Sequence, residues 1–149
     1  MKKILFVCTG NTCRSPMAAA IANHFFKNHG LDAVAASCGV FAQDGAEASA
    51  HAAAVMVARG LCVDGHRAKK ISPEDLAEAD LIIAMTKGHK AHLLALMSDF
   101  VEKIQTFGEL CEIKTVDISD PFGGSEAVYQ ACAAQISEYI ENLDWERFL

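Results

Sequence analysis

The sequence contains few aromatic residues, few prolines and no long hydrophobic run. Aromatic residues make up 7% of the 149 residues, with 3 prolines and 1 tryptophan, whereas the hydrophobic content is 52%. A core of this composition must be mainly aliphatic and rich in alanine. The apolar run at residues 4–7 is too short for a membrane span or for the core of a signal peptide. The length suffices for a sizeable core, so we expect a single domain over residues 1–149.

An excess of basic residues is also absent. The net charge of −6 argues against nucleic acid or an anionic membrane as the main partner, so any anion must be bound by local groups. The six cysteines include no Cys-x-x-Cys pair, and we predict neither a metal nor a cofactor. Without a secretory leader, and with a core that needs no disulfide, these cysteines are expected to be free thiols of a cytoplasmic protein.

The most informative stretch is residues 4–20, where the apolar run ends at Cys8 and a loop with one glycine follows. Ser15 and Pro16 predict a helix start, because serine caps free N–H groups and proline is tolerated at the first helical position. A loop between a strand end and a helix start directs its N–H groups into one concavity, which suits a tetrahedral oxyanion. Arg14 would close this concavity with a planar fork that binds two phosphate oxygens.

This placement predicts a nucleophilic cysteine. The loop dipoles, the helix N-terminus and Arg14 favour the thiolate of Cys8, which is the reactive form. The same groups would stabilise the oxygens of a phosphoryl group in line with the sulfur, and the Ser15 hydroxyl could ease the departure of the sulfur. The alternative is a buried, inert cysteine before an ordinary loop. The six-residue spacing of Cys8 and Arg14, with a strand before and Ser-Pro after, favours a covalent phosphocysteine mechanism.

Residues 8–15, Cys-Thr-Gly-Asn-Thr-Cys-Arg-Ser, resemble the signature loop of the low-molecular-weight protein tyrosine phosphatases. Asp120-Pro121 is similar to the general-acid motif of that family. The resemblance covers nearly the whole chain and is closest to the branch that dephosphorylates phosphoarginine in bacterial proteins, through Thr12 and residues 39–42, 84–86 and 120–125. It implies that the substrate is bound by the loop and by the residue after the Asp-Pro pair: Thr9, Gly10, Asn11, Thr12, Cys13, Ser15 and Phe122.

The proton for the leaving group is expected from Asp120, which Pro121 would hold in an extended conformation. A routine Asp-Pro turn is the alternative for this motif, and Asp117 is the second candidate acid. Substrate choice depends on Thr12 and Phe122, because the tyrosine-specific branch usually has an aliphatic residue and a tyrosine at these places. A threonine hydroxyl suits a polar guanidinium leaving group, so we favour phosphoarginine over phosphotyrosine.

The sequence does not assign a single role to four further side chains. In the family, the hydroxyl at Ser37 helps to fix the unusual backbone of Asn11, although a plain turn after the strand is an equal alternative. His66 is expected at the surface, with orientation of the loop as the other possibility, and His89 is expected to be solvated. The resemblance also implies a protective Cys8–Cys13 disulfide on oxidation, and the alternative is that Cys13 is a small residue that fits the turn.

The hydrophobic pattern predicts an α/β fold, specifically a three-layer α/β/α sandwich with a central four-stranded parallel sheet and a phosphate-binding loop after the first strand. Strands are expected at residues 4–7, 34–37, 81–85 and 104–107, and residues 113–118 lead into the Asp120 loop. Helices are expected from Ser15, over 46–59, and after the caps Ser72, Thr86 and Ser125. The inward-facing residues of the first and last helices are predicted to be Met17, Ile21 and Phe25, and Val128, Cys132, Ile136 and Ile140.

Three other functions share parts of this pattern. An arsenate reductase would need a downstream cysteine pair, and residues 81–92 contain no cysteine. A phosphocysteine carrier of the sugar-transport type needs neither Arg14 nor the Asp120-Pro121 motif, and an inactive phosphate-binding module would not keep Cys8, Arg14 and Asp120 together. We therefore expect a monomeric phosphatase that acts on phosphorylated proteins and releases inorganic phosphate.

Overall fold

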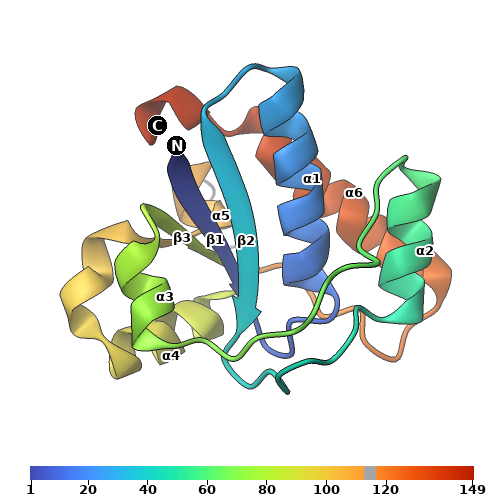
Figure 1. Ribbon diagram of the computed structural model, residues 1–149, viewed down its shortest axis with the longest axis horizontal. Coiled ribbons are helices and arrows are strands. Elements are labelled where there is room, and N and C mark those ends of the chain that lie inside the picture. Colours follow the sequence, from blue (N-terminus) through green and yellow to red (C-terminus); the bar gives the residue numbers. More distant parts are fainter. Residues whose placement is uncertain (113–116) are drawn as a thin grey trace.

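A parallel four-stranded sheet lies between two layers of helices in the computed structural model, which describes residues 1–112 and 117–149 (Figure 1). The strand order is β2-β1-β3-β4, and all neighbouring pairs are parallel. This arrangement confirms the predicted three-layer sandwich. The strands are β1 (Lys2–Cys8), β2 (Ala33–Gly39), β3 (Leu81–Ala84) and β4 (Ile104–Thr106).

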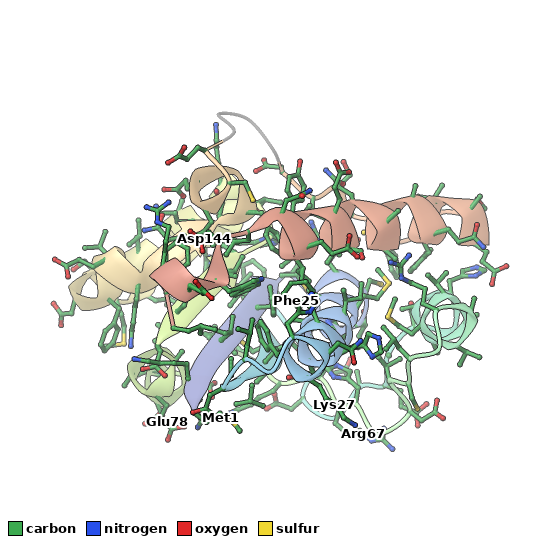
Figure 2. The ribbon with its side chains drawn as sticks, turned by 90° about the horizontal axis from the view of Figure 1, so that it is seen from above. Met1, Phe25, Lys27, Arg67, Glu78 and Asp144 are labelled. Carbon is green, nitrogen blue, oxygen red and sulfur yellow. The ribbon has the colours of Figure 1, made fainter. Side chains whose placement is uncertain are left out.

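Helices separate the strands along the chain, because parallel neighbours need crossover connections. They are α1 (Arg14–Asn28), α2 (Ala50–Ala58), α3 (Pro73–Glu78), α4 (Lys87–Leu96), α5 (Phe107–Leu110) and α6 (Glu126–Asn142), with short 3-10 helices η1 (Ser98–Lys103) and η2 (Trp145–Arg147). Helices α1 and α6 lie side by side on one face of the sheet, and α3 and α4 cover the other face (Figures 1 and 2).

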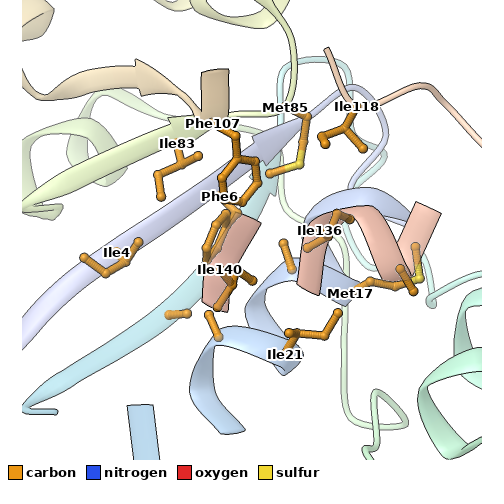
Figure 3. Close-up of a cluster of buried hydrophobic side chains, with 14 of the residues drawn as sticks. Ile4, Phe6, Met17, Ile21, Ile83, Met85, Phe107, Ile118, Ile136 and Ile140 are labelled. Atoms are coloured by element: carbon orange, nitrogen blue, oxygen red, sulfur yellow. The ribbon is translucent and has the colours of Figure 1, made fainter. Parts of the chain in front are cut away.

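The central strand β1 is buried on both faces because its apolar side chains alternate between two cores. Ile4 and Phe6 belong to the larger core with residues of α1 and α6, which Figure 3 shows as a continuous cluster. Leu5 and Val7 point into the smaller core with residues of α3 and α4. Strand β1 is therefore packed on both faces, which fixes the position of its carboxyl end and of the loop that follows.

The predicted helix caps at Ser72 and Thr86 are confirmed, and Ser72 forms a reciprocal capping box with Asp75. Ser125 occupies the cap position of α6, but its side chain makes no cap hydrogen bond. The prediction for α1 was wrong, because this helix begins at Arg14 and Ser15 does not cap it.

Three other details differ from the expectations. Helix α2 begins at Ala50 and not at residue 46, because Ser49 accepts a hydrogen bond from the Ala52 N–H and so ends the preceding loop. The inward-facing residue of α1 is Phe26, since Phe25 is only half-buried, and α6 buries Tyr129 and leaves Val128 47% exposed. The buried face of each helix was thus predicted one residue too early, at the end of α1 and at the start of α6.

Part of the predicted approach to Asp120, residues 113–116, lies outside the described residues. Among the helices that the structure describes, none combines the length and the apolar character that crossing a bilayer requires. Both chain ends lie near the amino ends of the strands, opposite to their carboxyl ends (Figure 1).

Candidate active site

Cys8 is the last residue of β1 and pairs with Gly39, the last residue of β2. In parallel sheets, ligands bind beyond the carboxyl ends of the strands, which is where the loop of residues 9–13 connects β1 to α1. The Cys8 side chain is buried, with 2% of its surface exposed. The predicted cysteine therefore lies at the base of this loop.

The carbonyl groups of this loop are held from outside by hydrogen bonds. The Val40 and Phe41 N–H groups donate to the carbonyls of Cys8 and Thr9, both at 2.9 Å, and the Ser49 N–H donates to that of Thr12 at 2.9 Å. Because the N–H in a trans peptide plane points opposite to its C=O, the amides of these planes point the other way, toward the interior of the loop. Such a loop is suited to an anion, and anion binding at this place stays a prediction.

Asn11 has a left-handed backbone, with φ of 56°, and its side chain explains how this conformation is maintained. Its Nδ2 donates to Ser15 Oγ at 2.8 Å and to Ser37 Oγ at 2.9 Å, and its Oδ1 accepts from the Lys69 N–H at 2.9 Å. The predicted contact between Ser37 and Asn11 is thus present in the structure.

His66 also contacts the loop. Its Nε2 lies 2.6 Å from the Asn11 carbonyl oxygen, and since a carbonyl can only accept, this nitrogen donates. The preferred expectation of a surface histidine was therefore wrong, and the loop-orienting alternative fits the geometry.

Gly39→Ala is expected to disturb this loop strongly. A Cβ at residue 39 would lie 2.5 Å from the Thr9 carbonyl oxygen and 2.9 Å from the Asn11 nitrogen, and neither backbone atom can move freely. We expect the free energy of unfolding to fall by about 2–4 kcal/mol, measured by urea denaturation, as for other overpacked sites. Gly65→Ala is the matched control, since nothing lies within 4 Å of its added Cβ. Equal stability of the two variants would contradict the prediction.

Ser15 lies beside the sulfur of Cys8 and not at a helix cap. The distance between Cys8 Sγ and Ser15 Oγ is 2.9 Å, and Ser15 is fully buried. This hydroxyl can donate to a thiolate and so stabilise its negative charge. The expected interaction with the sulfur is present, although α1 begins one residue earlier, at Arg14, and has no side-chain cap.

Arg14 is 5% exposed, and its guanidinium is held at both ends. Nη1 donates to the Ile118 carbonyl at 2.8 Å, and Nη2 donates to Thr9 Oγ1 at 3.3 Å. Nη2 also lies 3.6 Å from Asp120 Oδ2. A buried arginine with this many partners keeps one orientation, which suits the binding of two phosphate oxygens.

The Asp120 loop meets the 9–13 loop at one cavity of about 250 Å³. The Asp120 side chain is 51% exposed, and its Oδ1 accepts from the Phe122 N–H at 3.1 Å. Asp117, the second candidate acid, instead accepts from the Lys87 N–H at 2.9 Å and is absent from this cavity lining. The cavity is lined by Cys8, Thr9, Gly10, Thr12, Cys13, Arg14, Asp120 and Phe122.

Cys13 lies in a small polar cluster that the sequence did not indicate. Its sulfur is 3.4 Å from the Tyr129 hydroxyl and 3.5 Å from Ser49 Oγ. Burial raises the pKa of Tyr129, so this hydroxyl stays neutral. All six cysteines are free thiols. Burial also raises the pKa of Cys132 to about 11, so this neighbouring cysteine is no competing nucleophile.

A family model described as low molecular weight phosphotyrosine protein phosphatase matches residues 3–147. The chain belongs to this family. It is therefore a cysteine-dependent protein phosphatase, as the sequence predicted.

Several relatives of this phosphatase support the assignment. The chain is 40% identical to a protein-arginine-phosphatase of Geobacillus stearothermophilus, over 95% of this chain and 93% of that one. A crystal structure of a low molecular weight protein tyrosine phosphatase from T. tengcongensis is 41% identical, with a TM-score of 0.92 and coverage of 95% and 97%. A YwlE arginine phosphatase mutant with a phosphorylated active-site serine is 33% identical, with a TM-score of 0.91 and coverage of 94% and 91%.

The sequence predicted the wrong environment for His89. His89 was expected to be solvated, but it is 7% exposed and contacts Thr9 in the loop. The residue follows β3, whose carboxyl end lies beside that of β1, so the parallel topology brings it to the site. The described ranges contain no group of three histidine, cysteine or acidic residues placed to hold a metal ion.

Proposed function

We propose that this protein hydrolyses phosphoarginine in proteins through a phosphocysteine intermediate. Cys8 acts as nucleophile, Arg14 binds the phosphoryl group, and Asp120 is the general acid and then the general base. The observation that carries this proposal is the shared cavity, which Cys8, Arg14 and Asp120 all line and in which the Asp120 carboxylate lies 3.6 Å from the guanidinium of Arg14.

The first step transfers the phosphoryl group to sulfur. The Cys8 thiolate attacks phosphorus and forms the S–P bond, while the P–N bond to the substrate guanidine breaks. Protonated Asp120 gives its proton to the leaving nitrogen, which becomes part of a neutral or cationic guanidine. The loop amides and Arg14 stabilise the charge on the three equatorial oxygens during this transfer.

The second step releases phosphate. The Asp120 carboxylate takes a proton from water, and the water oxygen attacks phosphorus as the S–P bond breaks. The electron pair of that bond returns to sulfur, where the Ser15 hydroxyl at 2.9 Å can donate to the thiolate. Inorganic phosphate leaves, and Asp120 is protonated again for the next turnover.

Two features support phosphoarginine as the substrate. Thr12 presents a hydroxyl at the cavity wall, where the leaving guanidine and the attacking water need a polar partner. The relative at 40% identity is named a protein-arginine-phosphatase. Phosphotyrosine is the second candidate, favoured by Phe122, which is 78% exposed at the mouth of the cavity and could pack against a phenol ring.

The test is a comparison of kcat/KM for phosphoarginine and phosphotyrosine in peptides of the same sequence, with Cys8→Ser as the blank. We expect phosphoarginine to be preferred by about tenfold or more, since polar groups that lose their partner discriminate strongly. A preference for phosphotyrosine would contradict the proposed substrate but not the proposed mechanism. No turnover of either peptide, or of a simple aryl phosphate, would reject the hydrolase.

Thr12→Ile is expected to shift the ratio of these two kcat/KM values by about tenfold toward phosphotyrosine, because it replaces a polar contact by an apolar one. The Thr12 carbonyl is anchored by the Ser49 N–H, so the loop should keep its shape. Thr12→Ser keeps the hydroxyl and is the matched control, with the ratio expected close to that of the wild type. An unchanged ratio in Thr12→Ile would remove Thr12 from the specificity argument.

The remaining expectations are part of the same proposal. We propose a single domain over residues 1–149 that acts as a monomer in the cytoplasm, without metal, cofactor, nucleic acid or membrane. The net charge of −6 supports the last two points, and the free thiols are compatible with a reducing compartment. Gel filtration with light scattering would measure the oligomeric state.

A further inference from the structure

His89 is a buried titratable residue that the proposed reaction does not use. Both ring nitrogens make hydrogen bonds, Nδ1 with Thr86 Oγ1 at 3.0 Å and Nε2 with Thr9 Oγ1 at 2.8 Å. The Thr86 hydroxyl also accepts from the His89 N–H at 3.1 Å, as the cap of α4. The ring is thus fixed between the start of α4 and the first residue of the 9–13 loop.

The Thr9 hydroxyl links His89 to Arg14. Arg14 Nη2 donates to Thr9 Oγ1 at 3.3 Å, so the Thr9 oxygen lies between a guanidinium and an imidazole. Since a guanidinium has only donors, the Thr9 oxygen must accept from Arg14. The bond to His89 then fixes the side chain of Thr9 and, through it, the Nη2 end of the guanidinium.

The His89 ring is uncharged near neutral pH, which suits a position close to Arg14. Burial and the positive charge of Arg14 lower the pKa of His89 to about 4, and His92 acts in the same direction. The carboxylates of Asp117 and Asp120 oppose this shift but do not overcome it. The imidazole is therefore neutral near pH 7, and it can support Arg14 without repelling it.

We propose that His89 is a positioning residue of this phosphatase, which holds Arg14 through the Thr9 hydroxyl in the plane that meets the phosphoryl oxygens. The other end of the guanidinium, Nη1, is held independently by the Ile118 carbonyl. Loss of His89 therefore leaves the Nη1 contact in place but releases the Thr9 hydroxyl to which Nη2 donates. This inference deepens the proposed function and rests on it.

Three variants separate the two hydrogen bonds of the ring. His89→Gln places an amide where Nε2 lies and can keep the contact with Thr9, whereas His89→Asn reaches only the Nδ1 position and Thr86. His89→Leu removes both contacts. With an aryl phosphate, we expect kcat/KM to fall about tenfold in the Leu and Asn variants, with a similar rise in the inhibition constant of inorganic phosphate. His89→Gln should stay within about threefold of the wild type, because the guanidinium keeps its support.

Thr9→Val tests the same contact from the loop side and covers the case in which a His89 variant fails to fold. Thr9→Val should show the loss seen in His89→Leu, and the double variant should lose no more than either single one. Wild-type activity of His89→Leu, retention by Asn with loss by Gln, or additive losses would each overturn the positioning role. A wild-type protein that hydrolyses no phosphate would reject the function itself, which is a different outcome.

Discussion

Replacing Cys8 by serine is expected to lower kcat by about 10⁴-fold or more while the protein still binds inorganic phosphate. A serine hydroxyl is not ionised near neutral pH, and an alkoxide is a far poorer leaving group than a thiolate. The loop amides and Arg14 are unchanged, so the affinity for phosphate, measured by calorimetry, should stay close to that of the wild type. Any phosphoryl group that does transfer should remain on the serine, where mass spectrometry would detect it.

Cys62→Ser is the matched control for this variant. Cys62 is exposed, and its sulfur accepts from the Asp64 N–H at 3.4 Å, a bond that a serine oxygen can keep. We expect its kcat to equal that of the wild type. If Cys8→Ser kept on the order of 1% of the wild-type rate, Cys8 would not be the nucleophile and the covalent mechanism proposed for it would be rejected.

Asp120→Asn is expected to lower kcat by about 10²–10³-fold for a substrate with a poor leaving group, the usual contribution of a general acid. An amide cannot give up the proton that the leaving nitrogen or oxygen needs. The loss should shrink for p-nitrophenyl phosphate, because its leaving group needs little protonation. Phosphate affinity should change little, since the contact between Asp120 and Arg14 is long, at 3.6 Å, and partly exposed.

Asp117→Asn separates the role of Asp120 from the mere presence of an acidic residue. Asp117 lies three residues earlier and accepts from the Lys87 N–H at the start of α4. We expect it to keep the wild-type kcat and to lose at most about 0.3–1 kcal/mol of stability, because the amide oxygen can still accept from the Lys87 N–H and only the negative charge at the start of α4 is removed. An equal loss of kcat in both variants would assign the proton to a group other than Asp120.

The fold was predictable because its strands are short apolar runs separated by clear helix starts. Ser72 and Thr86 both cap helices as the sequence indicated, and the four strands lie where the runs predicted. The exact phase of the helices was not predictable. Phe25 and Phe26 are adjacent and equally apolar, and packing against Trp145 decides that Phe26 is the buried one.

The local part of the site was also predictable, since Cys8, Arg14 and Ser15 lie within one loop and one helix turn. The contact between Ser15 and the sulfur and the conformation of Asn11 both agree with the expectations. The meeting of this loop with Asp120 depended on the resemblance, because a separation of more than 100 residues leaves no pattern in the chain.

The histidines were misjudged for the same reason. His66 and His89 occur in polar surroundings in the sequence, where a solvated side chain is the usual outcome. Each is drawn into the site by a hydrogen bond to a residue more than 50 positions away, Asn11 and Thr9 respectively. Tyr129 escaped notice because α6 turns it, and not Val128, toward Cys13.

The outward anchoring of the 9–13 loop has a consequence for thermal behaviour. The partners of its carbonyl groups come from the end of β2, from the segment around His66 and from the start of α2, so the anion-binding shape exists only in the native state. We therefore expect phosphate to bind the folded form alone, so that its addition raises the melting temperature by ligand linkage. At 100 times the dissociation constant the stabilisation amounts to about 2.7 kcal/mol. Product accumulating in the cell would thus protect this enzyme against heat while it inhibits turnover.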